Sequence, residues 1–352
     1  MAIDILTNKA DLRDLRAVDV QPEPLGEGQV RLRLDRFALT ANNVTYSAFG
    51  EMFSYWKFFP GPEGFGRSPV WGFAEVEESR SDAVKVGQRV WGYYPLGTHL
   101  VVTPIKAGPH GFVDGAEHRR GLPPVYNQYL LVQPGDARSE ALTALFKPLF
   151  TTSFVIDDQF EANGFYGAET VLFASASSKT ALGAAWLMRR RKAVQVVGLT
   201  SPRNVALTEK TAAYDRVVTY AEVAELAKRP TAFVDMAGDS AVQMAVHTHF
   251  ADALKASVSV GATHWDAPRA AATLPGPAPT FFFAPDVIVA RTKEWGNDVF
   301  QSKVEAAQAA FLASAAAWLE VDEARGVDAT IAAWRALVDG RANPEQGLIR
   351  GV

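Results

Sequence analysis

The sequence predicts an α/β protein with two domains, one rich in short antiparallel strands and one built on a parallel sheet. Three observations lead to this prediction: the length of 352 residues, a first third in which apolar and polar residues alternate, and a middle region in which apolar strands alternate with helical patterns. A chain of this length can bury two separate cores. Its composition, 48% hydrophobic and 21% charged, is that of a globular protein.

Charge and cysteine content exclude several classes of function. The formal net charge of -4 gives no general attraction for nucleic acid or for an anionic membrane surface. The chain has no cysteine, which excludes disulfides, thiol nucleophiles and cysteine-ligated metals. No segment reaches the roughly 20 apolar residues of a membrane span, and the charged N-terminus is unlike a signal peptide. We therefore expect a cytoplasmic protein whose partner is a small molecule, not a nucleic acid or a membrane.

Residues 1–133 have the pattern of a compact β domain. Short segments alternate apolar and polar residues and are separated by glycine and proline, which is typical of antiparallel strands joined by turns. The strand segments are QVRLRLDRFAL, VWGFAEVEES, QRVWGYYPL, THLVVTP and YNQYLLVQP.

Residues 134–275 alternate strands with helices. The strand segments are VLFAS, VQVVGL, DRVVTY, AFVDMAG and SVSVGA. They are almost continuously apolar, as expected for strands covered on both faces, and their alternation with helices predicts right-handed βαβ units around a parallel sheet. This region is therefore predicted to be a doubly wound domain.

The C-terminal region, residues 276–352, follows a proline-rich connector. It contains two helical patterns and the closing segment GLIRGV. Because it is too short and too helical for a third domain, we assign it to the first one.

The segment TVLFASASSKTALGAAWLM joins a strand to a helix through small polar residues. Such a turn directs free backbone N–H groups and the positive end of the helix dipole at one point, which suits an anion. The glycines that normally let a pyrophosphate approach are missing, but hydroxyls and a lysine could bind it. A plain turn capped by serine has the same pattern, and the lack of a glycine before the lysine disfavours a P-loop ATPase. The candidate residues are Ser175, Ser177, Ser178, Lys179 and Thr180.

The second strand of this region is followed by residues that bear on the choice of dinucleotide. NAD-preferring folds place an acidic residue there to bind the ribose. In place of this acid the sequence has Thr200, Ser201, Arg203 and Asn204. Their hydroxyl, guanidinium and amide groups suit a 2′-phosphate. A helix start with Ser201 as its cap and Pro202 in the first turn fits equally well. Together with the phosphate turn, this segment favours NADP(H) over NAD(H).

Several segments resemble the medium-chain dehydrogenase/reductase superfamily over nearly the whole chain. The resemblance is carried by VWGFAEVEESRSDAVKVGQRVWGYYPLGTHLVV, AAYDRVVTY, VDMAGDSAV and VDATIAAWRALVDGRANPEQGLIRGV. It implies that residues 1–133 and 276–352 form a GroES-like catalytic domain and that residues 134–275 form a Rossmann-type dinucleotide-binding domain. It adds Tyr220 and Gly261 to the residues expected at the cofactor, and it implies a homodimer.

The absence of cysteine removes the zinc ligands of one branch of the superfamily, so the chain resembles the zinc-free quinone-oxidoreductase and enoyl-reductase branches, as a divergent subfamily. The resemblance implies an NADPH-dependent reductase that transfers hydride to a quinone or to a carbonyl-conjugated double bond. Two alternatives stay open. One is an enoyl-thioester reductase, and the other is a non-catalytic dinucleotide-binding or sensing protein, which the missing glycines favour.

The segment LTANNVTYSAFG resembles the part of the family that lines the active site. Hydride transfer without a metal needs oriented hydrogen-bond donors for the developing oxyanion. A phenol with its usual pKa of about 10 is protonated at neutral pH and can donate, whereas a buried ring bonded to the backbone is the alternative. The catalytic candidates are Tyr46, Asn43 and Asn42.

Aromatic residues gather in the loop EMFSYWKFFPGPEGFG and again after the proline-rich connector. They could wall a pocket for a flat substrate, or they could anchor the loop to the core and form a dimer contact. The substrate-pocket candidates are Tyr55, Trp56, Phe59, His264 and Phe282.

Overall fold

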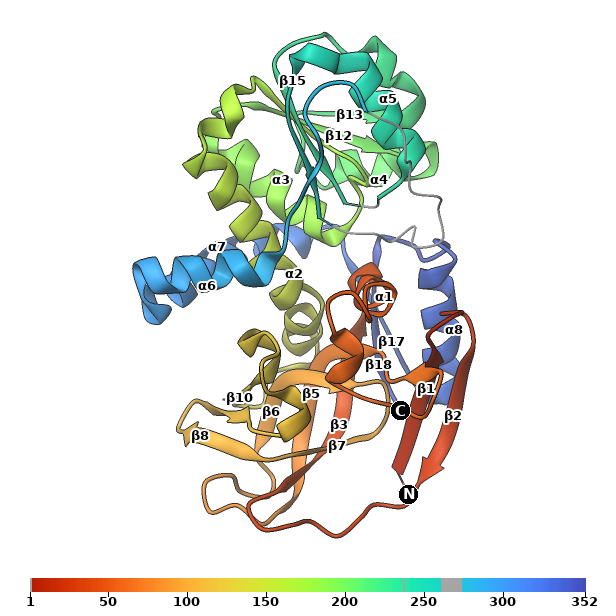
Figure 1. Cartoon of the computed structure of the whole chain (residues 1–352), viewed down its shortest axis with the longest axis vertical. Coiled ribbons are helices and arrows are strands. Elements are labelled where there is room, and N and C mark those ends of the chain that lie inside the picture. The colour runs from red at the N-terminus through yellow and green to blue at the C-terminus, as the bar shows by residue number, and fades with distance from the viewer. Residues whose placement is uncertain (1, 237, 261–273) are drawn as a thin grey trace. The chain divides into compact units, whose positions relative to one another are not determined.

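A computed structural model of the chain describes residues 2–236, 238–260 and 274–352. The chain forms two compact units: unit 1 comprises Met1–Leu145 and Val321–Val352, and unit 2 comprises Phe146–Glu320 (Figure 1). The sequence placed these boundaries after residues 133 and 275. They differ because helix α2 (Ala137–Ala162) runs from unit 1 into unit 2, and because the first two helices after the proline-rich connector, α6 (Ala284–Trp295) and α7 (Asn297–Ala315), belong to unit 2.

Unit 1 is an antiparallel β structure. Its large sheet has the strand order β17-β18-β3-β5-β6-β10-β9-β8, with β7 paired to β3, and a small sheet has the order β2-β1-β4. The strands predicted in residues 1–133 correspond to β3, β5, β6, β7 and β10, which confirms the β-rich domain. The strand bounds are β1 (Ala2–Asn8), β2 (Leu15–Val20), β3 (Val30–Leu39), β4 (Phe65–Gly66), β5 (Pro69–Ser79), β6 (Arg89–Pro95), β7 (His99–Val102), β8 (Pro104–Gly108), β9 (Gly111–Asp114), β10 (Gln128–Val132), β17 (Glu320–Arg325) and β18 (Gln346–Gly351).

Two helices and three short 3₁₀ turns complete unit 1. They are α1 (Ala41–Ala48), α8 (Val327–Val338), η1 (Tyr55–Lys57), η2 (Glu117–Arg119) and η3 (Pro124–Asn127). The closing segment GLIRGV forms β18, which pairs antiparallel with β3. The end of the chain therefore returns to the first unit, as the sequence predicted.

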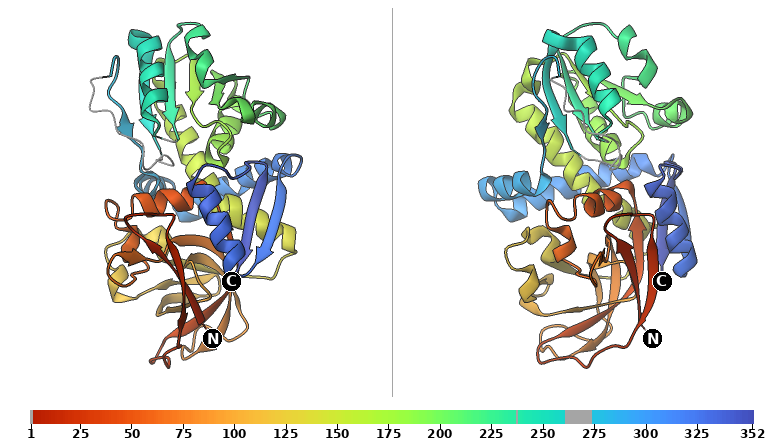
Figure 2. Two further views of the ribbon diagram at one scale, coloured as in Figure 1. Left: turned by 90° about the vertical axis from the view of Figure 1, so that its right-hand side faces the viewer. Right: turned by 45° about the vertical axis from the view of Figure 1, so that its right-hand side comes forward.

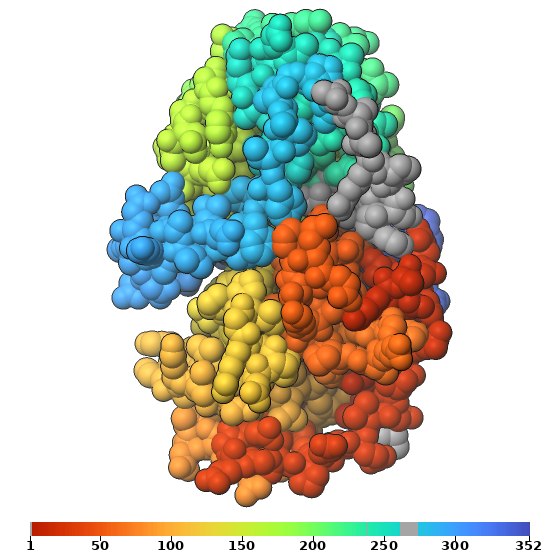
Figure 3. Space-filling view, viewed as in Figure 1, coloured from red at the N-terminus to blue at the C-terminus, as the bar shows by residue number. Residues whose placement is uncertain are grey.

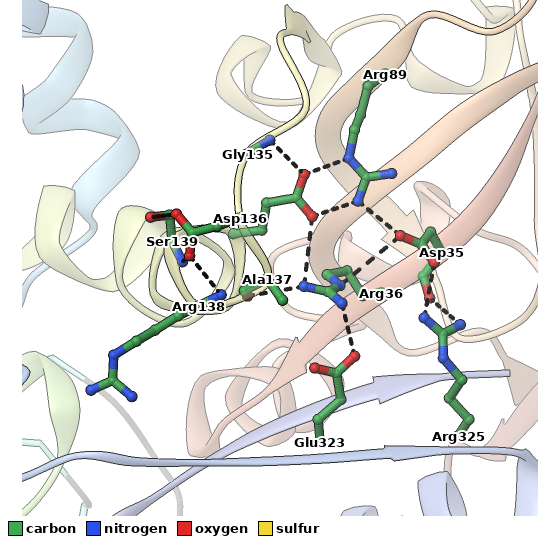
Figure 4. Close-up of polar contacts among 11 residues, drawn as sticks. Asp35, Arg36, Arg89, Gly135, Asp136, Ala137, Arg138, Ser139, Glu323 and Arg325 are labelled. Carbon is green, nitrogen blue, oxygen red and sulfur yellow. Dashed lines mark hydrogen bonds and ion pairs between the residues drawn. The ribbon is translucent and has the colours of Figure 1, made fainter.

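A network of arginines and carboxylates joins β3, β6, β17 and the start of α2 within unit 1 (Figure 4). The carboxylate of Glu140 accepts two hydrogen bonds from Arg89, both of 2.6 Å, and lies 3.7 Å from Arg36. Arg36 also donates to the carbonyl of Ala137, at 2.9 Å, and to Glu323, at 2.9 Å. Because these groups satisfy one another, the first turn of α2 is held firmly against the sheet.

Unit 2 is built on a six-stranded parallel sheet with the order β13-β12-β11-β14-β15-β16. This is the order 3-2-1-4-5-6 of the doubly wound dinucleotide fold, so the predicted Rossmann-type domain is confirmed. Figure 2 shows helices on both faces of the sheet, which explains why its strands are almost entirely apolar. The strand bounds are β11 (Thr170–Phe173), β12 (Gln195–Thr200), β13 (Arg216–Thr219), β14 (Thr231–Asp235), β15 (Leu254–Ser259) and β16 (Thr280–Phe281).

The helices of unit 2 agree with the sequence in part. Between β13 and β14, where the alternating pattern predicts a helix, the chain forms only a 3₁₀ turn, η6 (Tyr220–Glu225). Helices α6 and α7 lie on the molecular surface in Figure 3, where Val289 and Val299 are about half exposed. The helix bounds are α3 (Lys179–Arg191), η5 (Pro202–Asn204), α4 (Val205–Lys210), α5 (Ser240–Phe250), α6 (Ala284–Trp295) and α7 (Asn297–Ala315).

Candidate cofactor and substrate sites

The turn between β11 and α3 has the backbone conformation of a glycine turn, although it contains no glycine. Ser175 lies in the left-handed region, with φ 51°. Only glycine adopts this region without strain. Ser178 caps the helix, since its Oγ accepts a hydrogen bond of 3.3 Å from the backbone N–H of Ala181. The strained residue marks this turn as a functional candidate.

Replacing Ser175 with glycine is expected to raise the free energy of unfolding of unit 2 by about 1 kcal/mol, because it removes the left-handed strain of a residue with a Cβ. Ser175→Ala keeps the Cβ and should leave stability within about 0.5 kcal/mol of wild type. Urea unfolding of the three proteins measures the difference. Equal stabilities for all three would show that the turn is not strained.

The segments that follow β11, β12 and β13 come together at one edge of the sheet. Asn204 Nδ2 donates to Ser177 Oγ, at 3.1 Å, and the backbone N–H of Ser175 donates to the hydroxyl of Tyr220, at 3.2 Å. A Cβ added at Gly198 would lie only 2.8 Å from the Cβ of Ala176, so glycine in β12 lets the turn approach closely. This is the carboxyl edge of the strands, where doubly wound sheets bind their ligands.

Ser201 presents a buried hydroxyl at the same edge. Its Oγ has no hydrogen-bond partner within the described residues. Ser201 precedes the turn η5, but its side chain makes no capping hydrogen bond. The capping role that the sequence left open is therefore not observed. Buried polar groups are rarely left without a partner, so this hydroxyl is suited to a ligand oxygen.

The other residues predicted at the cofactor lie nearby in the chain. Thr200 is buried at the end of β12, whereas Arg203 is exposed. Lys179 and Thr180 begin α3 and are partly exposed. Although Lys179 as a whole is partly exposed, desolvation of its amine lowers the pKa to about 8. Two predicted residues, Gly261 and His264, lie outside the described residues.

In unit 1, helix α1 carries the three predicted catalytic residues. Both polar atoms of the Asn43 side chain are hydrogen-bonded within unit 1. Oδ1 accepts from the backbone N–H of Thr40, at 2.7 Å, and Nδ2 donates to the carbonyl of Pro69, at 2.8 Å. These bonds cap α1 and tie it to β5. We therefore correct the predicted role of Asn43 from catalytic to structural.

Tyr46, by contrast, sits in a cluster of buried aromatic residues. Its hydroxyl accepts a hydrogen bond of 3.2 Å from Trp71 Nε1. Burial raises the pKa of Tyr46, and hydrogen bonds with Trp71, Asn42 and Tyr126 oppose this shift only in part. The phenol is therefore protonated at neutral pH and is able to donate a hydrogen bond.

Three members of this cluster were not predicted. The hydroxyl oxygens of Tyr126 and Tyr55 lie 3.0 Å apart, and the ring centroids of Tyr93 and Tyr46 lie 5.5 Å apart. Trp71 of β5 is directly opposite Tyr93 of β6. The signal was present in the segments VWGF and VWGYY, where aromatic residues alternate along two strands and therefore share one face.

The described pocket candidates of unit 1 have different surroundings within that unit. The ring of Trp56 fills the space left by Gly50 and Gly66, where an added Cβ would lie 2.0 and 2.3 Å from it. Trp56 therefore packs against its own loop and does not line a pocket.

Phe59 is fully buried, and the guanidinium carbon of Arg119 lies 4.8 Å from the centroid of its ring. A cavity of about 610 Å³ in unit 1 is lined by Phe59 but not by Tyr46 or Tyr55. Phe282 is buried in unit 2, and its N–H donates to the carbonyl of Ser259. In unit 1, the ring of Tyr55 contacts that of Tyr46, at 4.8 Å between ring centroids.

Within the part of the chain that the structure describes, no group of three histidine, aspartate or glutamate side chains could hold a metal ion. None of the described helices combines the length and the apolar character needed to cross a membrane.

The antiparallel unit and the 3-2-1-4-5-6 parallel sheet together define the fold of the medium-chain dehydrogenases/reductases, as the sequence resemblance implied. The chain belongs to the family described as "Protein of unknown function (DUF2855)", whose profile matches residues 37–343. A comparison with curated proteins found no match.

Solved structures share this fold along the whole chain. CurA from Vibrio vulnificus in complex with NADPH has a TM-score of 0.65 and 12% identity over 99% of this chain and 98% of that one. The yhdH oxidoreductase from Salmonella enterica in complex with NADP has a TM-score of 0.56 and 13% identity, covering 100% of both chains. The quinone oxidoreductase of Pseudomonas syringae pv. Tomato DC3000 has a TM-score of 0.56 and 15% identity over 99% of each chain.

Proposed function

We propose that this protein is an NADP(H)-dependent oxidoreductase that acts on a quinone or a carbonyl-conjugated double bond without zinc. The observation that carries the proposal is the carboxyl edge of the parallel sheet. There the Ser175–Ser178 turn meets the segment Thr200–Asn204, which has no acidic residue and offers a buried hydroxyl that has no partner among the described residues. The similar structures of CurA and yhdH oxidoreductase, described in complex with NADPH and NADP, support it.

The residues at this edge fit a dinucleotide that carries a 2′-phosphate. Ser177, Ser178 and Lys179, at the start of α3, would bind the pyrophosphate with the help of the helix dipole. Ser201 and Asn204 would hold the ribose 2′-phosphate, because hydroxyl and amide groups donate to phosphate oxygens where an acidic residue would repel them. When bound, NADPH supplies the hydride.

On unit 1, Tyr46 is the residue that we propose to bind the substrate's carbonyl oxygen, with Asn42 beside it. A protonated phenol can donate to the oxygen as negative charge develops there. The aromatic rings around Tyr46 would favour a flat conjugated substrate over a small polar one.

Introducing a carboxylate at Ser201 tests the cofactor assignment. Ser201→Asp is expected to weaken NADPH binding by at least about tenfold and to shift preference toward NADH, because the new charge would repel the 2′-phosphate. Ser201→Ala, the matched control, removes one hydrogen bond and should weaken NADPH binding about three- to tenfold without favouring NADH. Fluorescence titrations with both cofactors measure the outcome. An unchanged cofactor preference in Ser201→Asp would place the 2′-phosphate elsewhere.

Affinity for NADPH should also depend on pH through Lys179. Since the pKa of this amine is lowered to about 8, it is charged below pH 8 and neutral above it. A bound anion favours the charged form, so affinity should fall by up to about tenfold for each pH unit above 8. Lys179→Gln should bind NADPH more weakly and lose this dependence. A wild-type affinity that stays constant from pH 7 to pH 9.5 would remove Lys179 from the phosphate site.

A second candidate function is a sensor that binds the dinucleotide without turnover. One observation favours it: the turn between β11 and α3 lacks the glycines that are typical of dinucleotide-binding enzymes. Oxidation of NADPH over a panel of quinones and enones distinguishes the two candidates, since a sensor would bind NADPH but oxidise none of them.

A further inference from the structure

In the hydrogen bond between Trp71 and Tyr46, the chemistry of the indole group determines which side chain is the donor. The indole Nε1 lies 3.2 Å from the phenol oxygen. An indole N–H can only donate, so the Tyr46 oxygen accepts, and its own proton must point away from the indole. Both side chains are buried, at 5% and 6% exposure, and such a bond is stronger there than in water.

Trp71 is itself held rigidly by the sheet. It lies on β5, directly opposite Tyr93 of β6. Its ring stacks on Trp91, with 4.7 Å between centroids and 20° between planes, and contacts Tyr93 at 4.9 Å. Tyr46, in contrast, lies on the short helix α1. The sheet therefore provides a fixed donor that orients a hydroxyl carried by a separate element.

We infer that Trp71 is a positioning residue that fixes the Tyr46 hydroxyl as a hydrogen-bond donor to the substrate's carbonyl oxygen. The inference rests on the proposed function, because it needs a substrate that binds at Tyr46. A donor at one side of a hydroxyl polarises its O–H bond and strengthens the bond that it donates. Trp71 acts through Tyr46 and does not touch the substrate.

The hydrogen bond can be tested without cofactor or substrate. In a ¹H–¹⁵N spectrum of the protein, the indole signal that disappears in Trp71→Phe belongs to Trp71. In Tyr46→Phe this signal should move upfield, because the indole loses its acceptor. If Trp71→Phe does not fold, Trp71→Tyr provides the same assignment. A Trp71 signal that keeps its position in Tyr46→Phe would overturn the inference.

Kinetics test the positioning role. Trp71→Phe should lower kcat about tenfold, the loss expected from one hydrogen bond, with the Kd for NADPH unchanged. Trp334→Phe, which removes a buried indole N–H that donates to the carbonyl of Leu12 outside this cluster, should keep kcat within twofold. If wild type turns over and Trp71→Phe matches it, the inference fails and the proposed function stands. If wild type neither binds NADPH nor reduces any quinone or enone, both fail.

Discussion

Replacing Tyr46 with phenylalanine is expected to lower kcat for a quinone or enone by about 100-fold, while the Kd for NADPH stays unchanged. The substitution removes one hydroxyl from a buried ring and keeps its packing against Tyr55, Tyr93 and Tyr126. Removal of a single donor to a developing oxyanion typically costs 10²- to 10³-fold in kcat. Steady-state kinetics and a separate NADPH titration distinguish lost chemistry from lost binding.

Tyr94→Phe is the matched control. Tyr94 is adjacent to Tyr93 on β6 and equally buried, and its hydroxyl donates to the backbone carbonyl of Val90, at 3.0 Å. The variant loses a buried hydroxyl outside the cluster, so its kcat should stay within about twofold of wild type. Full activity in Tyr46→Phe would remove Tyr46 from the mechanism.

The second large effect concerns stability. Glu140→Gln is expected to lower the free energy of unfolding of unit 1 by about 3 kcal/mol or more. Removing one partner of a buried ion pair leaves the other charge uncompensated, which costs about 3–5 kcal/mol. Here Arg89 and Arg36 lose the buried carboxylate that they share and keep only the more exposed Asp35 and Glu323, as Figure 4 shows. Urea unfolding followed by tryptophan fluorescence measures the change.

The same network supplies the control for this prediction. Glu323 also bonds to Arg36, at 2.9 Å, but its side chain is 33% exposed. Glu323→Gln should therefore cost less than about 1 kcal/mol, as is usual for partly solvated pairs. Equal losses in the two variants would mean that burial does not govern the strength of this network.

The large-scale fold could be predicted because its signals are local. The strands β11 to β15 are short apolar runs, and the helices between them have their own periodicity. Helix α2 has weaker signals: Pro148 lies inside it, and Thr151, Thr152 and Val155 disfavour a helix. Its hydrogen bonds with β3 and β6 involve residues far apart in the sequence. No element was therefore predicted over these residues.

The candidate site residues of unit 2 could be predicted from the sequence more completely than those of unit 1. In unit 2, the residues that bind a dinucleotide follow consecutive strands, so their meeting at one edge follows from the parallel topology. In unit 1, the residues around Tyr46 come from α1, η1, β5, β6 and η3, and only the strand register brings Trp71 opposite Tyr93. Asn43 was misassigned because an amide that caps a helix and one that binds a substrate have the same sequence signal.

The most direct test of the account is a titration of the purified protein with NADPH and with NADH, followed by nicotinamide fluorescence. The serine and asparagine side chains at the ends of β11 and β12 predict saturable NADPH binding and much weaker NADH binding. Binding of neither cofactor, or tighter binding of NADH, would contradict the assignment of this edge as an NADP(H) site.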